Sequence, residues 1–286
     1  MSGPGTSKTK DEIAADQEAF WNGPGGEAWL ASWERIQRTV TPFGQQALEE
    51  AAVNPGERAL DVGCGTGQTT ADLARAVGPQ GRVLGVDVSE TLLNVARAQE
   101  IPNATFVLGD AATQPLDPSS FDLVFSRFGV MFFADPVPAF ANFRQALKDS
   151  GRIVFVCWRT PPENPWVSVP VRAAAPFLAP INRPGPEDPG PFSFGDTARV
   201  ERIFKEAGLA PPTFRKLDRS LRVGATIDET IDNITRFGPL VRPFADSPPD
   251  QVAKAKAAVA DALKPHAKPD GVFLDGACWL VRTSKR

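Results

Sequence analysis

The sequence predicts an α/β fold in which seven strands form a mostly parallel sheet with helices on both faces. Three observations support this prediction. Apolar runs of strand length alternate with segments of helix-forming composition between residues 57 and 157. A glycine-rich turn at residues 63–67 joins the first apolar run to the first of these helices. The chain has 286 residues, 42% of them hydrophobic, which is enough for one large domain with a sizeable core.

Residues 1–52 are expected to form an N-terminal helical flap. Residues 1–10 have the composition of a disordered tail, whereas residues 11–52 contain helical pieces interrupted by W-N-G-P-G-G-E-A-W. Trp21, Trp29 and Trp33 could form part of a flap over a ligand. Trp29 and Trp33 are four residues apart on one face of a predicted helix, so a simple amphipathic contact is an equally good interpretation.

Residues 53–286 are expected to form the α/β domain itself. Asp135 and Pro136 suit the N-cap and the first position of the helix before the fifth strand. Asp196 and Gly208 suit the two ends of a later helix. Right-handed crossovers are expected to connect the parallel strands. The expected strands lie near residues 57–62, 82–87, 104–109, 121–126, 151–157, 214–223 and 277–283, with helices that include residues 68–77, 197–207 and 250–263.

Two segments, at about residues 159–195 and 224–272, are predicted to leave the sheet as insertions. Prolines are frequent between residues 161 and 249, and regular structure is hard to sustain there. Both insertions should emerge near the carboxyl ends of strands, where ligands bind in open α/β sheets. We therefore expect an inserted lid over the active-site face, with a packing or dimerisation element as the alternative.

The most informative motif is the segment A-L-D-V-G-C-G-T-G at residues 59–67, followed 24 residues after Gly63 by the acid Asp87. Glycine tolerates positive φ and lets a ligand lie on the main chain. A carboxylate at the end of the second strand is placed for a ribose diol. The glycine turn alone could be an ordinary strand–helix connection, but together with Asp87 it predicts a nucleoside-containing cofactor.

The spacing of the glycines differs from that of a dinucleotide-binding turn. A dehydrogenase would show G-x-G-x-x-G beneath a pyrophosphate, whereas Gly67 comes one residue early and is followed by Gln68. Asp61, just before the first glycine, would repel a phosphate and attract an ammonium group. A cofactor that is cationic at this end is therefore favoured over one that carries a pyrophosphate.

With these residues the chain resembles a class I S-adenosylmethionine-dependent methyltransferase. The first motif of that family stands here as Asp61 to Gly67, and its second-strand acid as Asp87. The segments F-V-L-G-D-A-A at 106–112 and F-D-L-V-F-S-R-F at 121–128 resemble the motifs of the third and fourth strands. The resemblance implies a Rossmann-like sheet and S-adenosylmethionine as the cofactor. The chain as a whole, including F-W-N-G-P-G-G-E-A-W at 20–29 and A-C-W-L-V-R-T at 277–283, resembles the bacterial group of ubiquinone-biosynthesis-like methyltransferases.

The resemblance also implies which residues hold the methionine and ribose parts of the cofactor. Asp61, Gly63 and the Ser126 carbonyl would hold the methionine ammonium group. Asp87 would accept hydrogen bonds from the ribose hydroxyls, and Val88 would pack against the adenine.

For the adenine, the resemblance implies that Asp110 accepts from the N6 amino group and that the Ala111 amide donates to a ring nitrogen. Asp110 could instead be an ordinary strand-end aspartate. Asp87 could be a turn residue beside a helix capped by Ser89. The other residues expected in the cofactor site are Cys64, Gly65, Gly67, Gln68, Gly109, Arg127, Phe128, Trp21 and Trp33.

The chemistry implied by the resemblance is in-line displacement of the sulfonium methyl group by an acceptor atom. Approach and alignment in such a reaction are worth roughly 7 to 11 kcal/mol. The chain has no tyrosine, and its one histidine, His266, lies in a polar stretch that predicts a solvated loop, so no catalytic base is assigned. Phe128, Phe132, Phe133 and Trp158 could face the sulfonium or an apolar acceptor, or could pack in the core.

The expected acceptor is a small, apolar or aromatic molecule. The segment S-R-F-G at 126–129 stands where methyltransferases of nucleic-acid bases carry an N/D-P-P-Y-type segment, and the net charge of −3 gives no reason to expect nucleic acid. No signal peptide and no run of about 18 apolar residues is found, so a cytoplasmic protein without a membrane partner is expected.

Several interpretations stay open at this point. Cys64, Cys157 and Cys278 have no metal-ligand spacing and are expected to be free, and no metal site is predicted. Either a monomer or a homodimer is compatible with the sequence. An NAD-dependent oxidoreductase and a non-catalytic S-adenosylmethionine-binding protein are the alternative functions.

Overall fold

The computed structural model describes residues 8–181, 185 and 187–285. Residues 1–7 of the predicted disordered tail lie outside this range, as do residues 182–184 and 186 of the proline-rich loop. Of the rest of that tail, Thr9 forms a capping box with Glu12, and a helix begins at Lys10, so the prediction of disorder is wrong at these positions.

The described part of the chain forms one sheet in the order β3-β2-β1-β4-β5-β8-β6, with a short β7 paired to β8. Strands β1 to β5 pair in parallel, whereas β8 pairs antiparallel with both β5 and β6. The predicted Rossmann-like, mostly parallel sheet of seven main strands is therefore confirmed. The strands are β1 (Arg58–Val62), β2 (Arg82–Asp87), β3 (Ala104–Leu108), β4 (Phe121–Arg127), β5 (Leu147–Trp158), β6 (Thr213–Gly224), β7 (Ala267–Lys268) and β8 (Gly271–Ser284).

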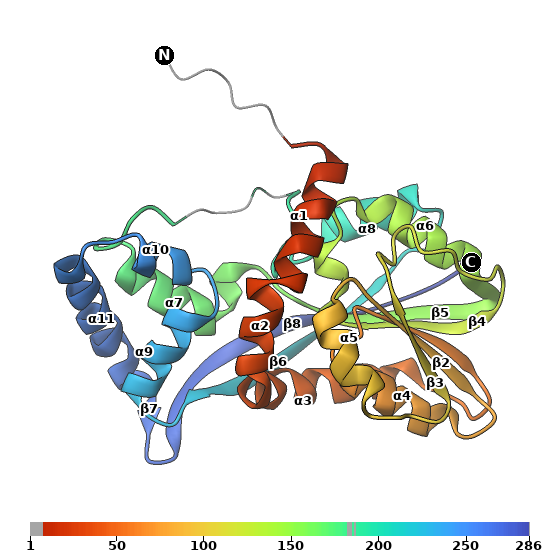
Figure 1. Ribbon diagram of the computed structural model, residues 1–286, viewed down its shortest axis with the longest axis horizontal. Coiled ribbons are helices and arrows are strands. Elements are labelled where there is room, and N and C mark those ends of the chain that lie inside the picture. Colours follow the sequence, from red (N-terminus) through yellow and green to blue (C-terminus); the bar gives the residue numbers. More distant parts are fainter. Residues whose placement is uncertain (1–7, 182–184, 186, 286) are drawn as a thin grey trace.

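Helices cover both faces of the parallel strands, as predicted (Figure 1). Because helices cover both faces, β1 and β4 are almost wholly buried. Strands in this position have nearly continuous apolar sequences. Asp135 and Pro136 occupy the predicted cap positions of α6, but the Asp135 side chain makes no capping hydrogen bond. Helices α3 (Trp33–Ala51) and α4 (Gln68–Val77) lie on one side of the sheet, α6 (Pro136–Ala146) and α8 (Thr197–Glu206) lie on the other, and α5 (Glu90–Arg97) packs on β2 and β3.

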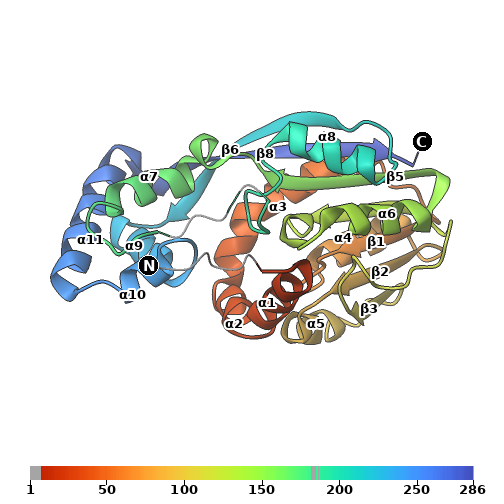
Figure 2. The ribbon, with the colours of Figure 1, turned by 90° about the horizontal axis from the view of Figure 1, so that it is seen from above.

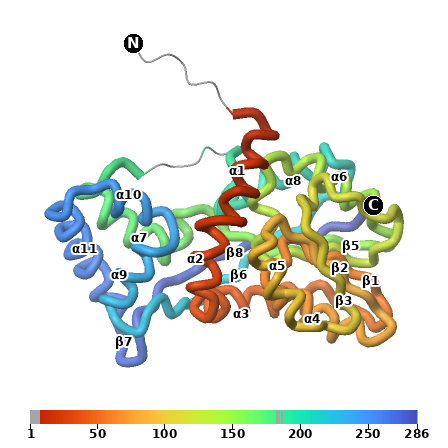
Figure 3. Tube along the Cα trace, viewed as in Figure 1, coloured from red at the N-terminus to blue at the C-terminus, as the bar shows by residue number. Residues whose placement is uncertain are grey.

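The N-terminal residues form three helices, α1 (Lys10–Asn22), α2 (Pro24–Ala31) and α3. The prediction that Trp29 and Trp33 share one helical face is wrong. Ser32 has left the helical conformation, with φ −108° and ψ 10°, so α2 ends there and α3 begins in a new direction. In the trace of Figure 3, α1 and α2 run between the sheet and a second group of helices.

That second group packs around an apolar core of its own. Figure 2 shows it beside the sheet and joined to it by the long strands β6 and β8. Strand β8 begins at Gly271 rather than at the predicted 277 because it continues its pairing with β6 as far as Val272. The group holds α7 (Pro165–Ala174), α9 (Ile227–Arg236), α10 (Val241–Ala245) and α11 (Pro249–Leu263), with Ile231, Leu240, Val259, Leu263 and Leu274 among its buried residues. Short 3₁₀ turns lie at η1 (Val130–Phe132), η2 (Pro161–Glu163) and η3 (Lys264–His266).

Candidate functional site

The turn between β1 and α4 has the conformation that its glycines predict. Gly63, Gly65 and Gly67 have φ of 68°, 54° and 83°, values that side chains rarely allow. A Cβ on Gly63 would lie 2.9 Å from the Gly129 Cα, so two main-chain segments meet there without room for a side chain. The Gly63 amide donates to the Val86 carbonyl at 2.9 Å, which holds the turn against the end of β2.

Asp87 ends β2 and accepts two backbone hydrogen bonds. Its Oδ2 accepts from the Gly65 amide at 2.8 Å and its Oδ1 from the Ser89 amide at 2.9 Å. Ser89 caps α5, as the alternative interpretation of this segment predicted. Burial raises the pKa of Asp87, and the backbone amides oppose that change. Asp87 therefore shapes the turn and also lines the cavity beside it.

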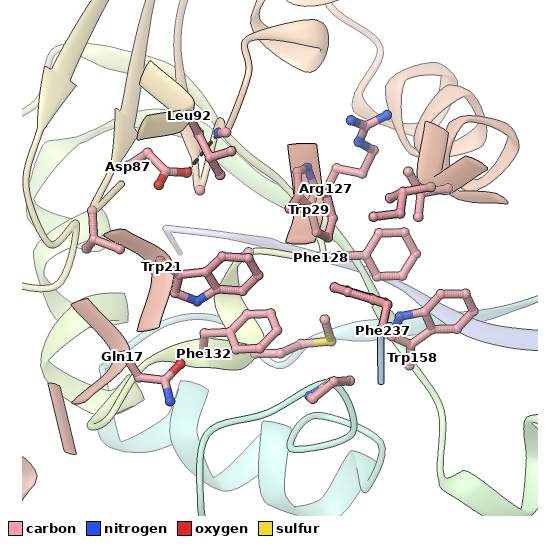
Figure 4. Close-up of a pocket in the computed structure, with 18 of the residues that line it drawn as sticks. Gln17, Trp21, Trp29, Asp87, Leu92, Arg127, Phe128, Phe132, Trp158 and Phe237 are labelled. Atoms are coloured by element: carbon pink, nitrogen blue, oxygen red, sulfur yellow. Dashed lines mark hydrogen bonds between the residues drawn. The ribbon is translucent and has the colours of Figure 1, made fainter. Parts of the chain in front are cut away.

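That cavity has a volume of about 580 Å³, within the range of small-molecule and cofactor sites. In Figure 4, Asp87 lies at one side of it, Phe128, Trp158 and Phe237 lie at the other, and Trp21 and Phe132 lie between them. The structure brings twelve of the sixteen predicted cofactor-site residues to its wall: Trp21, Trp33, Gly63, Cys64, Gly65, Asp87, Val88, Gly109, Asp110, Ala111, Arg127 and Phe128.

Asp61 does not line the cavity, because its side chain is buried behind the turn and is only 1% exposed. Thr70 donates to its Oδ2 at 2.7 Å, whereas its Oδ1 is buried without a hydrogen-bond partner among the described residues. Burial raises the pKa of Asp61 to about 7, although the Arg127 guanidinium and the Thr70 hydroxyl oppose this change.

Three further predicted residues also lie outside the cavity wall. The Ser126 hydroxyl donates to the Val62 carbonyl at 2.8 Å and so faces β1. Gly67 starts α4 against α5, where a Cβ would lie 3.0 Å from the Ala96 Cβ. The Gln68 side chain lies on α4 with its amide 3.5 Å from Asp72.

The half of the cavity away from Asp87 is lined by aromatic and aliphatic side chains. The sequence offered Phe128, Phe132, Phe133 and Trp158 as candidates for such a wall, and all four line the cavity, whereas the other residues of this half were missed. The rings of Phe128 and Trp158 stack with centroids 4.8 Å apart, and Trp166 lies 5.0 Å beyond Trp158. Phe132 also lines the cavity, in edge contact with Trp21 at 5.3 Å. Other apolar residues of the wall include Trp29, Ile36, Val40, Val167, Val171, Leu221, Val223, Ile234, Phe237, Leu240 and Leu274. In the sequence these residues have the spacing of ordinary core residues, so no signal separates them.

Charged side chains along the cavity are few. They are Asp11, Glu18, Arg35, Asp87, Asp110 and Arg127. No histidine is among them, since His266 lies in η3. Cys64, Cys157 and Cys278 are free and buried, as predicted, and burial raises the pKa of each thiol. Among the residues that the structure describes, no cluster of three or more His, Cys, Asp or Glu could hold a metal ion.

Comparison with known proteins agrees with this geometry. A family model for a methyltransferase domain matches residues 60–155. The chain is 31% identical over 177 residues to demethylmenaquinone methyltransferase from Staphylococcus aureus, in an alignment that covers 58% of this chain and 73% of that protein. The chain belongs to the class I S-adenosylmethionine-dependent methyltransferases. This methyltransferase therefore uses S-adenosylmethionine as its cofactor, as predicted, and nothing in the comparisons favours an NAD-dependent oxidoreductase.

Two further similarities were found for the methyltransferase. An uncharacterised 37.1 kDa protein in transposon TN4556 of Streptomyces fradiae is 39% identical over 109 residues, which cover 37% of this chain and only 32% of that protein. The crystal structure of the YcgJ protein from Bacillus subtilis superposes with a TM-score of 0.55 and 19% identity, over 85% of this chain and 97% of that chain, and shows the shared fold. In the described parts of the methyltransferase, no helix has the length and apolar character that crossing a membrane requires.

Proposed function

We propose that this methyltransferase transfers the methyl group of S-adenosylmethionine to a small, apolar or aromatic molecule. One observation carries the proposal: a single cavity joins a polar half, which contains the glycine turn and Asp87, to a half lined by aromatic and aliphatic side chains. Apolar walls with a few polar groups are typical of small-molecule sites. The name of the relative from Staphylococcus aureus, demethylmenaquinone methyltransferase, also supports a small acceptor.

The residues of the polar half fit the cofactor. The glycine turn presents main chain to the cavity at Gly63, where a Cβ would lie 2.9 Å from the Gly129 Cα, and the Asp87 carboxylate lines the same wall. We assign the ribose to Asp87 and the adenine to Asp110 and Ala111, which line the same wall. When bound, S-adenosylmethionine supplies a methyl group activated by the positive sulfur.

The protein itself positions the cofactor and the acceptor and keeps water out of the space between them. Aromatic faces such as those of Phe128 and Trp158 attract a cation and also hold an apolar acceptor. Alignment of this kind is worth roughly 7 to 11 kcal/mol of the barrier. Asp11, Glu18, Asp87 and Asp110 are the carboxylates along the wall, and none is assigned as a base.

The surrounding segments have proposed roles of their own. We assign α1 and α2, within the N-terminal flap 1–52, to covering the cofactor, and the insertions at about 159–195 and 224–272 to a lid over the acceptor. Residues from α1, α7 and α9 line the cavity, which supports both assignments. We also propose a cytoplasmic protein, monomeric or homodimeric, that acts without nucleic acid, and its net charge of −3 supports the last point.

The proposal is tested with labelled S-adenosylmethionine and a panel of small quinols, phenols, aromatic amines and thiols, with duplex DNA and transfer RNA as further arms. Mass spectrometry should detect the addition of one labelled methyl group to a member of the small-molecule panel. A reaction without protein is the control for non-enzymatic transfer. Labelling of a nucleic-acid arm alone would contradict the proposal.

A further inference from the structure

Arg35 is a cation in the wall of the cavity whose hydrogen-bonding capacity is not filled. It lies on α3, and its Nη2 is shielded from solvent without a hydrogen-bond partner among the described residues. The ion pairs found in the described parts of the chain do not include it. Its guanidinium carbon lies 5.9 Å from the ring centroid of Phe237, in the apolar half of the cavity.

The groups around Arg35 leave it short of negative charge. Burial and the neighbouring Arg38 lower the pKa of its guanidinium, and Glu229 opposes them. Glu229 is already engaged, because its Oε2 accepts from the Ala225 amide at 2.7 Å near the start of α9. Arginine stays ionised at neutral pH, so the charge persists without a close counter-charge. A buried donor without a partner is costly, and a ligand that supplies the partner is strongly favoured over one that does not.

The other charged groups of the cavity indicate where an anion could bind. Arg127, the second guanidinium along the wall, already donates to the Gln37 Oε1 at 3.1 Å. The remaining charged side chains of the wall are carboxylates, which would repel an anion. Of the two guanidinium groups along the wall, Arg127 has a hydrogen-bond partner, whereas the shielded Nη2 of Arg35 has none among the described residues.

We infer, on the basis of the proposed function, that the methyl acceptor carries an anionic oxygen, as in a carboxylate, which binds Arg35 while its apolar part lies against the aromatic wall. A guanidinium matches a carboxylate with two parallel hydrogen bonds, which fixes orientation as well as strengthening binding. Phe237, beside Arg35 and 6.2 Å from Trp29, gives the adjoining apolar part of the acceptor a surface. Arg35 is thus a residue that determines specificity for the acceptor.

The test uses two probes of the same shape, 2-naphthoate and 2-naphthamide, titrated by calorimetry in the presence of saturating S-adenosylhomocysteine. The wild-type protein should bind the carboxylate about tenfold or more tightly than the amide. Arg35→Gln should abolish this preference and leave S-adenosylhomocysteine binding unchanged. Arg38→Gln is the matched control, because Arg38 is exposed, does not line the cavity and carries the same charge. Arg35→Lys should keep part of the preference and serves as the test if the glutamine variant does not fold.

The outcomes separate this inference from the proposal on which it depends. Equal binding of the two probes to the wild type, or an unchanged preference in both Arg35 variants, would overturn the role of Arg35 and leave the apolar acceptor site standing. If S-adenosylhomocysteine binds but neither probe does, the apolar acceptor site is wrong and the inference falls with it. Equal loss of the preference in Arg38→Gln would show a long-range effect of charge and would also overturn the assignment.

Discussion

At the scale of single residues, Asp61 makes the stability of the fold depend on pH. Its side chain is 1% exposed, and only one of its two oxygens has a hydrogen-bond partner among the described residues. Burial raises its pKa from 3.8 to about 7. Ionising the carboxyl in the native state therefore costs more than ionising it in the unfolded chain.

The sign of the pH dependence follows from this direction. Between pH 4 and 7 the native state binds more protons at Asp61 than the unfolded chain does, so the stability that this residue contributes is lost as pH rises through that window. Asp61→Asn stays neutral throughout. From pH 5 to pH 8, we expect its free energy of unfolding to rise by roughly 3 kcal/mol relative to that of the wild type. Urea unfolding of both proteins without ligand measures the difference, and parallel stability curves would contradict the raised pKa.

The proposed contact between Asp87 and the ribose can be tested by substitution. Asp87→Ala removes the carboxylate proposed for the ribose hydroxyls, and each lost charge-assisted hydrogen bond costs on the order of 1.5 to 3 kcal/mol. Calorimetry should therefore show S-adenosylhomocysteine binding at least about tenfold more weakly. Asp117→Ala is the control, because it removes a charge from a side chain that is 72% exposed and outside the cavity wall. Equal affinities for the two variants would remove Asp87 from the site.

At the scale of elements, the start of α4 depends on Gly67 for two reasons. Its φ is 83°, and an added Cβ would lie 3.0 Å from the Ala96 Cβ and 3.2 Å from the tip of the Phe106 ring. Gly78, at the other end of α4, has a φ of 68° but a ψ of −174°, against a ψ of 5° at Gly67, and a Cβ there would lie in open space. The backbone therefore strains a side chain at both positions, in different regions of φ and ψ, and only Gly67 adds a close contact.

Alanine substitutions at these two glycines test the backbone and packing costs. We expect Gly78→Ala to lose roughly 1 to 3 kcal/mol of stability through its backbone conformation alone. Gly67→Ala should lose about 1 kcal/mol for its left-handed conformation and roughly 1 to 3 kcal/mol more, because α5 must move away from the turn. Denaturant midpoints for both variants provide the measurement. A loss of only about 1 kcal/mol in Gly67→Ala would show that the contact between the turn and α5 adjusts without cost.

At the scale of the whole molecule, the cavity draws its walls from both groups of elements. Asp87 and the glycine turn belong to the sheet, whereas Val171 and Ile234 belong to helices of the second group. A ligand that fills the polar half binds the native state and has no comparable site in the unfolded chain. Its binding is therefore expected to stabilise the molecule.

The size of this stabilisation depends on the ligand concentration relative to its Kd. S-adenosylhomocysteine at 100 times its Kd should add about 2.7 kcal/mol to the free energy of unfolding. For a chain of this size that corresponds to a rise in Tm of roughly 5 to 10 °C. NAD at the same concentration should leave Tm unchanged. If Asp87→Ala weakens binding 100-fold, the same concentration of S-adenosylhomocysteine should add only about 0.4 kcal/mol to the free energy of unfolding of that variant. A rise with NAD alone would contradict the cofactor assignment.

Local sequence signals were sufficient wherever the structure depends on neighbouring residues. The glycine turn, Asp87 and the strand–helix alternation were predicted because glycine φ values, capping and apolar periodicity act over a few residues. The break at Ser32 was missed because Trp29 and Trp33 keep helical spacing across it. The early start of β8 was missed because pairing with β6, which continues to Val272, and with β7, which reaches Gly271, extends the strand independently of local composition.

The amino-acid sequence was sufficient to predict the fold class, the family and the half of the cavity that we propose for the cofactor, because these predictions rest on short motifs. How the half proposed for the acceptor is built follows only from tertiary packing, since Arg35, Trp166 and Phe237 are far apart in the chain and meet around one cavity. It also decided that Asp61 is buried behind the turn rather than in the cavity wall. Burial and missing hydrogen-bond partners depend on every element packed around a group, and no local pattern records them.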